Sequence, residues 1–169
     1  MAIGDSAVCG TFKQQAMAGI HFWTAHTRTG SSAISADTFK VAMFTNDSSI
    51  DQDTTGYTTS NEVSGTAYTA GGAALGTVTL EVADNSSSVA TAFLDFADTT
   101  WSTSTISSAR GALIYNSTLS SAGTGSTVNH AAYPSVAVFN FGGDKSSSAG
   151  DFTIQWPADD ANNAAIRIA

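Results

Sequence analysis

The apolar and polar positions divide the chain into one helical stretch followed by a series of strands. Residues 11–23 place Phe12, Ala16, Met17, Ile20 and Trp23 at helical spacing, with polar residues and a glycine between them. This spacing predicts one amphipathic helix near the N-terminal end of the chain.

The start of this predicted helix has the spacing of a capping box. Thr11 is followed three residues later by Gln14. In a capping box the hydroxyl accepts a hydrogen bond from an amide of the first turn, and the glutamine side chain reaches back. We therefore expect the helix to begin at Thr11.

From residue 38 the period changes from 3.6 to 2. The stretch TFKVAMFT at residues 38–45 is apolar on both alternating sides, which predicts a strand with both faces at least partly covered. Six further segments have strand character and are mostly bounded by Gly, Asn, Asp or Ser: residues 76–83, 89–96, 109–116, 135–141, 151–156 and 165–168.

Four polar segments are predicted to connect these strands. Residues 84–88 form a hairpin loop in this interpretation, and residues 144–150, DKSSSAG, form a second hairpin turn. Residues 117–129 and 46–61 are the longest flexible-loop candidates. Each is either a solvated loop or a contact loop that becomes ordered on assembly, and the sequence leaves both possibilities open.

About seven short strands, one helix and no alternation of strands with helices predict an all-β fold. We expect an antiparallel β-sandwich or jelly-roll-like domain with one N-terminal helix. The expected organisation is an N-terminal segment at residues 1–37 and a β-sandwich domain at residues 38–169, together forming one compact domain.

The composition narrows the choice of partners. Among 169 residues, 6 are basic and 14 acidic, giving a net charge of −8, and only 12% are charged. Such a chain does not neutralise phosphates, so we expect neither nucleic acid nor an anionic membrane as a direct partner. Solubility then depends on 23 Ser and 23 Thr residues, which suits a protein that packs against copies or partners.

The single cysteine excludes an internal disulfide and a cysteine-based zinc site. Cys9 has no basic neighbour in sequence closer than Lys13, so we interpret it as a packing residue rather than a reactive thiol. The sequence shows no signal-peptide pattern and no apolar run of about 20 residues. We therefore expect synthesis and folding in a cytoplasm.

Metal and general-base chemistry have weak candidates. His21 and His26 are five residues apart, which does not place them on one helical face, and Asp37 or His130 would have to supply a third ligand. His130 would act as a base only beside a nucleophile. Structural roles are the expected ones for all three histidines, and we predict no metal site and no cofactor.

Hydrolytic chemistry is no better supported. No G-x-S-x-G segment occurs, and the abundance of serine removes any specificity from a Ser/His/Asp combination. Asp95, Asp98, Asp144 and Asp151 are the carboxylates that a glycosidase would use, but they stand at strand ends and in turns where Asp is ordinary. We predict no catalytic residue and hence no enzyme.

Three binding motifs are also considered. Gly71-Gly72 and Gly123-x-Gly125 lack the lysine and the strand–helix context of a phosphate loop. The segment at 159–163 offers oxygens for calcium but also fits a polar loop. A sugar-binding platform would use exposed aromatic side chains, and the four candidates for it are Trp101, Tyr115, Tyr133 and Trp156. We expect core positions for them instead, most clearly for Trp156.

Three longer segments carry a resemblance. They are TFKVAMFT at 38–45 with NEVSGTAYTAGGAAL at 61–75, FLDFADTTWSTSTISSARGALIYN at 93–116, and VAVFNFGGDKSSSAGDFTIQWPA at 136–158 with the closing AIRIA. Together they resemble a family of small virion structural proteins of tailed bacteriophages. The resemblance covers most of the chain from residue 38 and brings no catalytic residues with it.

This resemblance implies a virion component that is made in the host cytoplasm. We expect a capsid decoration, or cement, protein that stabilises the assembled head through contacts with the major capsid protein and with itself, as a homotrimer. The alternative is a tail, head–tail adaptor or fibre-associated component with a host- or glycan-binding role. Exposed Trp or Tyr side chains would favour binding, and converging Asp pairs would favour an enzyme.

Overall fold

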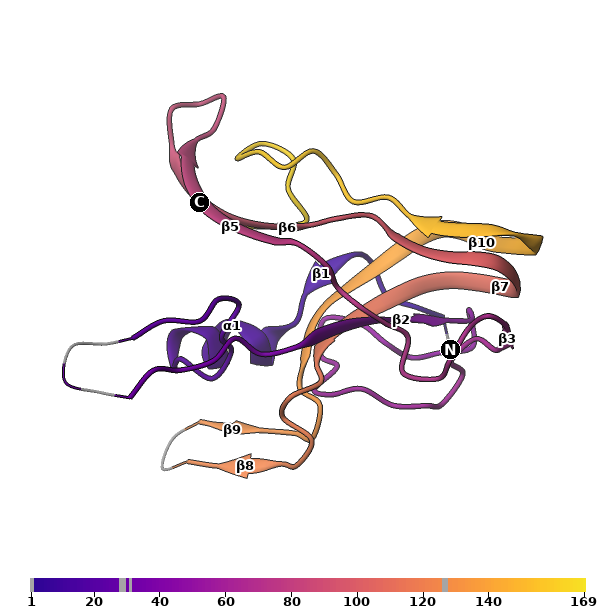
Figure 1. Cartoon of the computed structure of the whole chain (residues 1–169), viewed down its shortest axis with the longest axis horizontal. Helices are drawn as coiled ribbons and strands as arrows, with labels where there is room; N and C mark the ends of the chain where they lie inside the picture. Colours follow the sequence, from indigo (N-terminus) through magenta and orange to yellow (C-terminus); the bar gives the residue numbers. More distant parts are fainter. Residues whose placement is uncertain (1, 28–29, 31, 126–127) are drawn as a thin grey trace.

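The computed structural model describes residues 2–27, 30, 32–125 and 128–169, and the predicted fold class is confirmed. The chain is an all-β, antiparallel, sandwich-like domain with one short helix (Figure 1). The elements in chain order are β1 (Ala7–Val8), α1 (Gly10–Met17), β2 (Phe39–Phe44), β3 (Gly65–Thr66), β4 (Ala73–Ala74), β5 (Val78–Asp84), β6 (Ala90–Phe96), β7 (Thr99–Asn116), β8 (Gly123–Thr124), β9 (Asn129–His130), β10 (Ser135–Ile154) and β11 (Ile166–Ile168).

The described strands form three antiparallel sheets. The largest has the order β1-β10-β7-β2-β4, with β3 also paired to β7. A smaller sheet has the order β11-β6-β5, and β8 pairs with β9 in a separate ribbon. The loop predicted to be flexible at residues 117–129 contains β8 and the first residue of β9, and its residues 126–127 lie outside the described residues.

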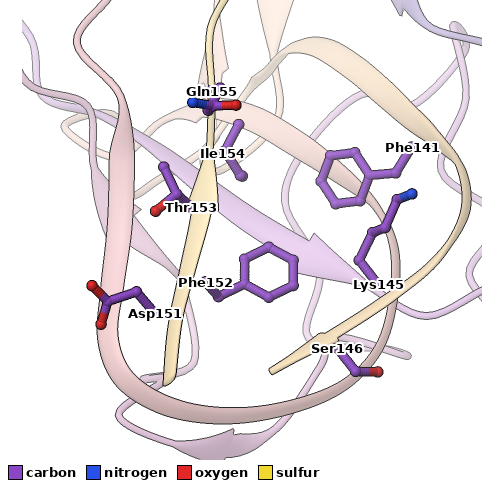
Figure 2. A pocket seen from close by; sticks show the side chains of 8 residues that line it. All are labelled: Phe141, Lys145, Ser146, Asp151, Phe152, Thr153, Ile154 and Gln155. Atoms are coloured by element: carbon purple, nitrogen blue, oxygen red, sulfur yellow. The ribbon is translucent and has the colours of Figure 1, made fainter. Parts of the chain in front are cut away.

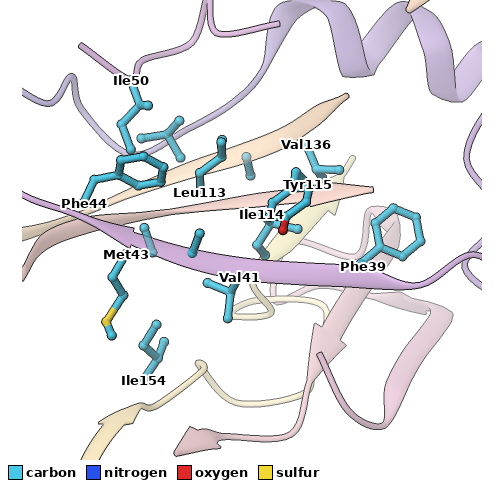
Figure 3. Packing of buried hydrophobic residues seen from close by; sticks show 14 of the residues in the cluster. Phe39, Val41, Met43, Phe44, Ile50, Leu113, Ile114, Tyr115, Val136 and Ile154 are labelled. Carbon is cyan, nitrogen blue, oxygen red and sulfur yellow. The ribbon is translucent and has the colours of Figure 1, made fainter. Parts of the chain in front are cut away.

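Strand β2 lies at the centre of the core, as the sequence predicts. Val41 and Met43 point to one face and Phe44 to the other, and all three are fully buried. Figure 3 shows Ile50 beside Phe44 on one side of β2, and Ile154 beside Met43 on the other. Because both faces are covered by apolar side chains, this strand shows no polar alternation.

The long hairpin of β7 and β10 folds back on itself. Phe139 lies early in β10, and Trp156 follows its end. A straight strand would separate two residues 17 positions apart by about 56 Å. Their ring centroids are instead 5.3 Å apart. The hairpin therefore bends, so that its far half lies over the sheet that its near half helps to form (Figure 1).

This bend corrects the predicted hairpin turn at residues 144–150. That segment belongs to one continuous strand, β10, whose two halves pair with β7 rather than with each other. The pairing runs from Ser135↔Tyr115 to Ile154↔Thr99 with five register shifts. The Ser- and Gly-rich stretch provides the bend: Gly142 and Ala149 have φ values of 72° and 47°.

The small sheet confirms three further predicted strands. β5 and β6 form the predicted hairpin, and because Asp84 pairs with Ala90 its loop is residues 85–89, one residue later than the predicted 84–88. β11 pairs with the other side of β6. Leu94, Phe96 and Ile166 belong to the same core cluster as β2, so the small sheet packs on the large one.

The N-terminal segment contributes to the same core. β1 pairs with β10, and the side chains of Ile3, Cys9 and Phe12 are buried in the main cluster. The polar segment at 46–61, the other predicted flexible loop, also contributes, because it buries Ile50.

The helix is shorter than predicted, and the capping box is wrong. α1 begins at Gly10, with Cys9 at the N-cap position and no side-chain cap. Thr11 is therefore already inside the first turn. The helix ends at Met17 because Gly19 adopts a left-handed φ of 69°. Trp23 then stacks on Phe39 with ring centroids 3.5 Å apart.

Trp156 holds the folded-back hairpin against the small sheet, since its ring centroid lies 5.3 Å from that of Phe139 and 5.3 Å from that of Phe96. We predict that Trp156→Ala lowers the free energy of unfolding by about 3–5 kcal/mol, measured by denaturant titration. Trp156→Phe loses less, and Val89→Ala, at an exposed position, changes it by at most about 0.5 kcal/mol. A loss below about 1 kcal/mol for Trp156→Ala would show that other contacts hold the bend.

Candidate interaction surface

His21 lies in a buried polar network rather than in a metal site. Its Nδ1 accepts a hydrogen bond from Asn116 Nδ2 at 3.1 Å, and its Nε2–H donates to Gln15 Oε1 at 2.9 Å. Gln15 in turn donates to the backbone oxygen of Asn129. Both ring nitrogens are used, and burial lowers the pKa of His21 from 6.5 to about 4. The ring is therefore held neutral.

The other residues weighed as metal ligands do not complete a site. Asp37 accepts hydrogen bonds from Asn116 Nδ2 at 2.8 Å and from the amide of Phe22 at 3.0 Å. His130 bonds the oxygen of Ala131 through Nδ1, and His26 is exposed. Across the part of the chain that the structure describes, no group of three His, Cys, Asp or Glu side chains is placed to hold a metal ion.

Each of the four candidate carboxylates has a local structural partner. Asp95 accepts from the amide of Phe96, and burial raises its pKa. Asp98 accepts from the amide of Trp156, and Asp151 from that of Thr103. Asp144 pairs with Arg110 at 3.3 Å. These contacts fix turns and strands.

The glycine pairs provide close backbone approach. A Cβ on Gly72 would lie 1.9 Å from the oxygen of Val41, and one on Gly123 would lie 2.1 Å from Nε2 of His130. Gly71 has a left-handed φ of 90°. The amide of Gly125 bonds Oδ1 of Asn129 at 3.1 Å. Gly71, Gly72 and Gly125 therefore serve turns and close backbone approach, and Gly123 lies against the side chain of His130.

The acidic loop and the cysteine also have structural roles. Asp160 accepts hydrogen bonds from the side chain and amide of Asn163 and from the amide of Asn162, which lowers its pKa. Its oxygens thus close the turn before β11. Cys9 is fully buried, and burial raises the pKa of its thiol, so the thiolate that reacts or binds metal is disfavoured.

The aromatic side chains considered for sugar binding are placed in the core. Trp101, Tyr115 and Trp156 are buried. Tyr133 packs edge-on against Tyr115, with the two ring centroids 6.2 Å apart. The predicted alternation that buries Trp156 is confirmed.

A hollow of about 410 Å³ lies beside the bend of β10. Figure 2 shows Phe141 and Lys145 on one side of it, and Phe152 and Ile154 on the other. Its lining carries a single carboxylate, Asp151, which already accepts the amide of Thr103. The hollow therefore offers no set of groups for acid–base chemistry.

Sequence reasoning missed the role of Glu62 in the NEVSG segment. Its carboxylate accepts hydrogen bonds from the hydroxyls of Tyr57 and Tyr68, at 2.6 and 2.7 Å, and from the amide of Gly71 at 2.7 Å. Burial raises the pKa values of both tyrosines, which therefore stay protonated and donate. Because Tyr68 also accepts from the amide of Met43, this network fastens residues 57–71 to β2.

One face of the small sheet is apolar over three successive rows, and only its outermost row, Ala90 with Asp84, carries a charge. The register stacks its side chains in rows that run from the core towards solvent. The rows are Phe96–Val78, then Ile166–Leu94–Leu80, then Ile168–Ala92–Val82.

Exposure of this apolar face rises along the rows. Phe96 is 7% exposed, Leu80 is 49% exposed, and Val82 and Ile168 at the outer end are 70% and 65% exposed. Met17, the last residue of α1, is 91% exposed and lines the same hollow as Ile168. We call these four exposed residues, Met17, Leu80, Val82 and Ile168, the apolar patch.

The patch is exposed because α1 does not cover it: the helix packs mainly against β9 and β10, and hollows lie between the helix and the strands β6 and β11. In Figure 1 the β5–β6 hairpin extends well past α1. A contiguous exposed apolar surface of this kind is typical of a protein–protein contact.

No described helix is both long and apolar enough to cross a bilayer.

The His21 network predicts a pH dependence of stability. Unfolded His21 binds a proton below pH 6.5, whereas the folded pKa is about 4, so stability is complete above pH 6.5 and falls as the pH drops to about 4. The loss attributable to His21 is about 3 kcal/mol. His21→Gln removes this part of the pH dependence, and His26→Gln, at an exposed ring, retains it. The free energy of unfolding is measured by chemical denaturation across this pH range. If it changed equally with pH in wild type and in His21→Gln, the assignment would be contradicted.

The Glu62 network predicts a second stability change. Glu62→Gln leaves one acceptor oxygen for three donors, so we expect the free energy of unfolding to fall by about 1–3 kcal/mol. The matched variant Glu81→Gln, on an exposed position of β5, changes it by at most about 0.5 kcal/mol. Equal effects of the two substitutions in chemical denaturation would mean that the network does not stabilise the fold.

Comparison with known proteins finds no match to this chain among protein-family models, curated proteins or solved structures.

Proposed function

We propose that the chain is a structural component of a tailed-bacteriophage virion, and specifically a capsid decoration protein. In this proposal it binds the major capsid protein and copies of itself, as a homotrimer, and strengthens the assembled head without catalysing a reaction. It is made in the host cytoplasm and resides in the virion.

The apolar patch is the observation that carries the proposal. It lies on a sheet that is joined to the core by buried aromatic contacts. A contact made by such a surface gains free energy from apolar burial rather than from charge. Moreover, only 12% of the residues are charged, so few charges lose hydration when the surface is covered.

Binding through this patch can stabilise a shell by mass action alone. A ligand that binds only the assembled state stabilises it by about 2.7 kcal/mol at a concentration 100 times Kd. Repeated over the many equivalent positions of a capsid, such contacts strengthen the shell. The resemblance of residues 38–75, 93–116 and 136–158 to phage particle proteins supports the virion assignment.

Quantitative mass measurement on purified virions tests the proposal. We expect a ratio near one copy per major capsid subunit, and retention of the chain on particles through moderate salt washes because the contact is apolar. Only about a dozen copies per particle would place the chain at the head–tail junction or in the tail. Its absence from purified particles would overturn the virion assignment.

A further inference from the structure

Strand β5 is an unpaired edge of the small sheet. In the order β11-β6-β5 it pairs with β6 on one side, and no described strand lies on the other side. Proline, lysine and bulges commonly protect such an edge from other chains. The seven residues of β5 contain no proline and no lysine, and their pairing with β6 has no register shift. The edge is therefore suited to accept a further strand.

The hydrogen-bond register shows which backbone groups of β5 point away from β6. The amide of Asn85 donates to the oxygen of Val89 at 3.0 Å, and these two residues directly follow the pair Asp84↔Ala90. In an antiparallel ladder only every second residue bonds across to its partner. Counting back from Asn85, the odd-numbered residues of β5 bond to β6. The outward amide and carbonyl groups belong to four residues, and no hydrogen bond to them occurs among the described residues: Val78, Leu80, Val82 and Asp84.

The same residues carry the apolar face of β5. Along a strand, the direction of the backbone groups and the face of the side chain alternate together. Val78, Leu80 and Val82 thus offer unpaired backbone groups at the edge and apolar side chains on the adjoining face. A strand that pairs with β5 satisfies these backbone groups and extends the apolar rows with every second side chain.

The charge of the hairpin selects the kind of strand that fits. An added strand extends both faces of the sheet, so it also meets the exposed Glu81, on the face opposite the patch. Asp84 stands at the outer end of the patch face. Residues 78–96 contain three carboxylates and no lysine or arginine. A strand with apolar side chains on one face and basic ones on the other therefore complements β5.

A second copy of this chain fits the edge less well. Its own β5 would bring another Glu81 and Asp84 and no basic side chain, and two chains with a net charge of −8 repel each other. We propose that β5 is a docking edge for an extended segment of a partner protein in which apolar and basic residues alternate. The segment adds as a fourth strand of the small sheet. Its apolar side chains pack beside Leu80 and Val82, and its basic side chains lie beside Glu81.

This inference rests on the proposed function for the source of the segment, which is then the major capsid protein, but its tests use the purified chain and synthetic peptides. A chain that binds the peptides as described below and is absent from virions would overturn the virion assignment alone. A chain that is present in virions and does not bind them through β5 would overturn this inference alone.

The first probe is the capped seven-residue peptide KVKVKVK, titrated into the isotope-labelled chain and followed by two-dimensional NMR. We expect the amide signals of Leu80 and Val82 to shift, because their N–H groups acquire partners. The capped peptide EVEVEVE has the same valines and the opposite charge, and we expect it to bind about tenfold more weakly. Shifts confined to other elements, or equal affinities of the two peptides, would overturn the proposal.

N-methylation of the peptide tests backbone pairing without changing the protein. Residues that face each other in a hydrogen-bonded pair carry their side chains on the same face, so the valine amides of the peptide point at β5. Methylating the nitrogen of the central valine is expected to weaken binding by about tenfold, whereas methylating that of the preceding lysine changes it by at most about twofold. Equal effects would show that the peptide does not pair with β5 as a strand.

Val82→Pro is the matching change in the protein. It removes an outward N–H and retains the bonds between β5 and β6, a position at which an edge strand tolerates proline. We expect it to weaken binding of KVKVKVK by about tenfold or more, and Val82→Ala, which keeps the N–H, to weaken it less. Thermal unfolding of both variants checks that the fold is retained. Equal affinities of the two folded variants would overturn the proposal.

Two further measurements test the charge and the occupant. Glu81→Lys is expected to abolish the preference for KVKVKVK over EVEVEVE, and an unchanged preference would show that the edge does not select a basic strand. Sedimentation velocity of the chain alone tests a second copy. Self-association of wild type that Val82→Pro abolishes would identify a second copy as the occupant and overturn the proposal, whereas equal behaviour of the two supports a different protein as the partner.

Discussion

The whole architecture depends on the folding back of the β7–β10 hairpin. One long ribbon provides strands for both layers, because its far half returns over the sheet that its near half belongs to. Trp156 occupies the point where the returning strand, the near half of β10 and the small sheet meet. Strand β2 is apolar on both faces for the same reason: each face lies against a layer of the fold.

The exposed apolar patch is a consequence of this arrangement. The inner end of the small sheet joins the core, where Phe96 reaches Trp156 and Trp23 and where Leu94 and Ile166 are buried. One face is also covered further out, because Phe93 packs against Ala161 and Ala164. The other face continues outward past the core, and α1 packs on β9 and β10 instead of covering it. Its apolar side chains are therefore left in solvent as a surface that can bind.

Local patterns in the sequence were sufficient for the strands with clear turn residues on both sides: β2, β5, β6 and β11 all lie within the predicted segments or within one residue of them. They were insufficient for β10, since Ser and Gly produce the same pattern in a hairpin turn and in a bent strand, and only the partner strand distinguishes the two. Apolar spacing continued through Ile20 and Trp23 and so extended the predicted helix, although Trp23 lies beyond the end of the helix, where tertiary packing half-buries it. The buried pair of His21 and Asn116 is separated by 95 residues, a distance at which local pattern carries no information.

The polar interior and the apolar exterior have complementary roles. The networks around His21 and Glu62 consist of short, directional hydrogen bonds within the framework, and a buried network that is fully satisfied favours one arrangement of the chain. Rigidity of this kind matters for a projecting hairpin, because a flexible arm would lose conformational entropy whenever it was bound. Apolar contact has little directionality by itself, so the shape of the patch, held by the rigid framework, is a feature that can orient a bound surface.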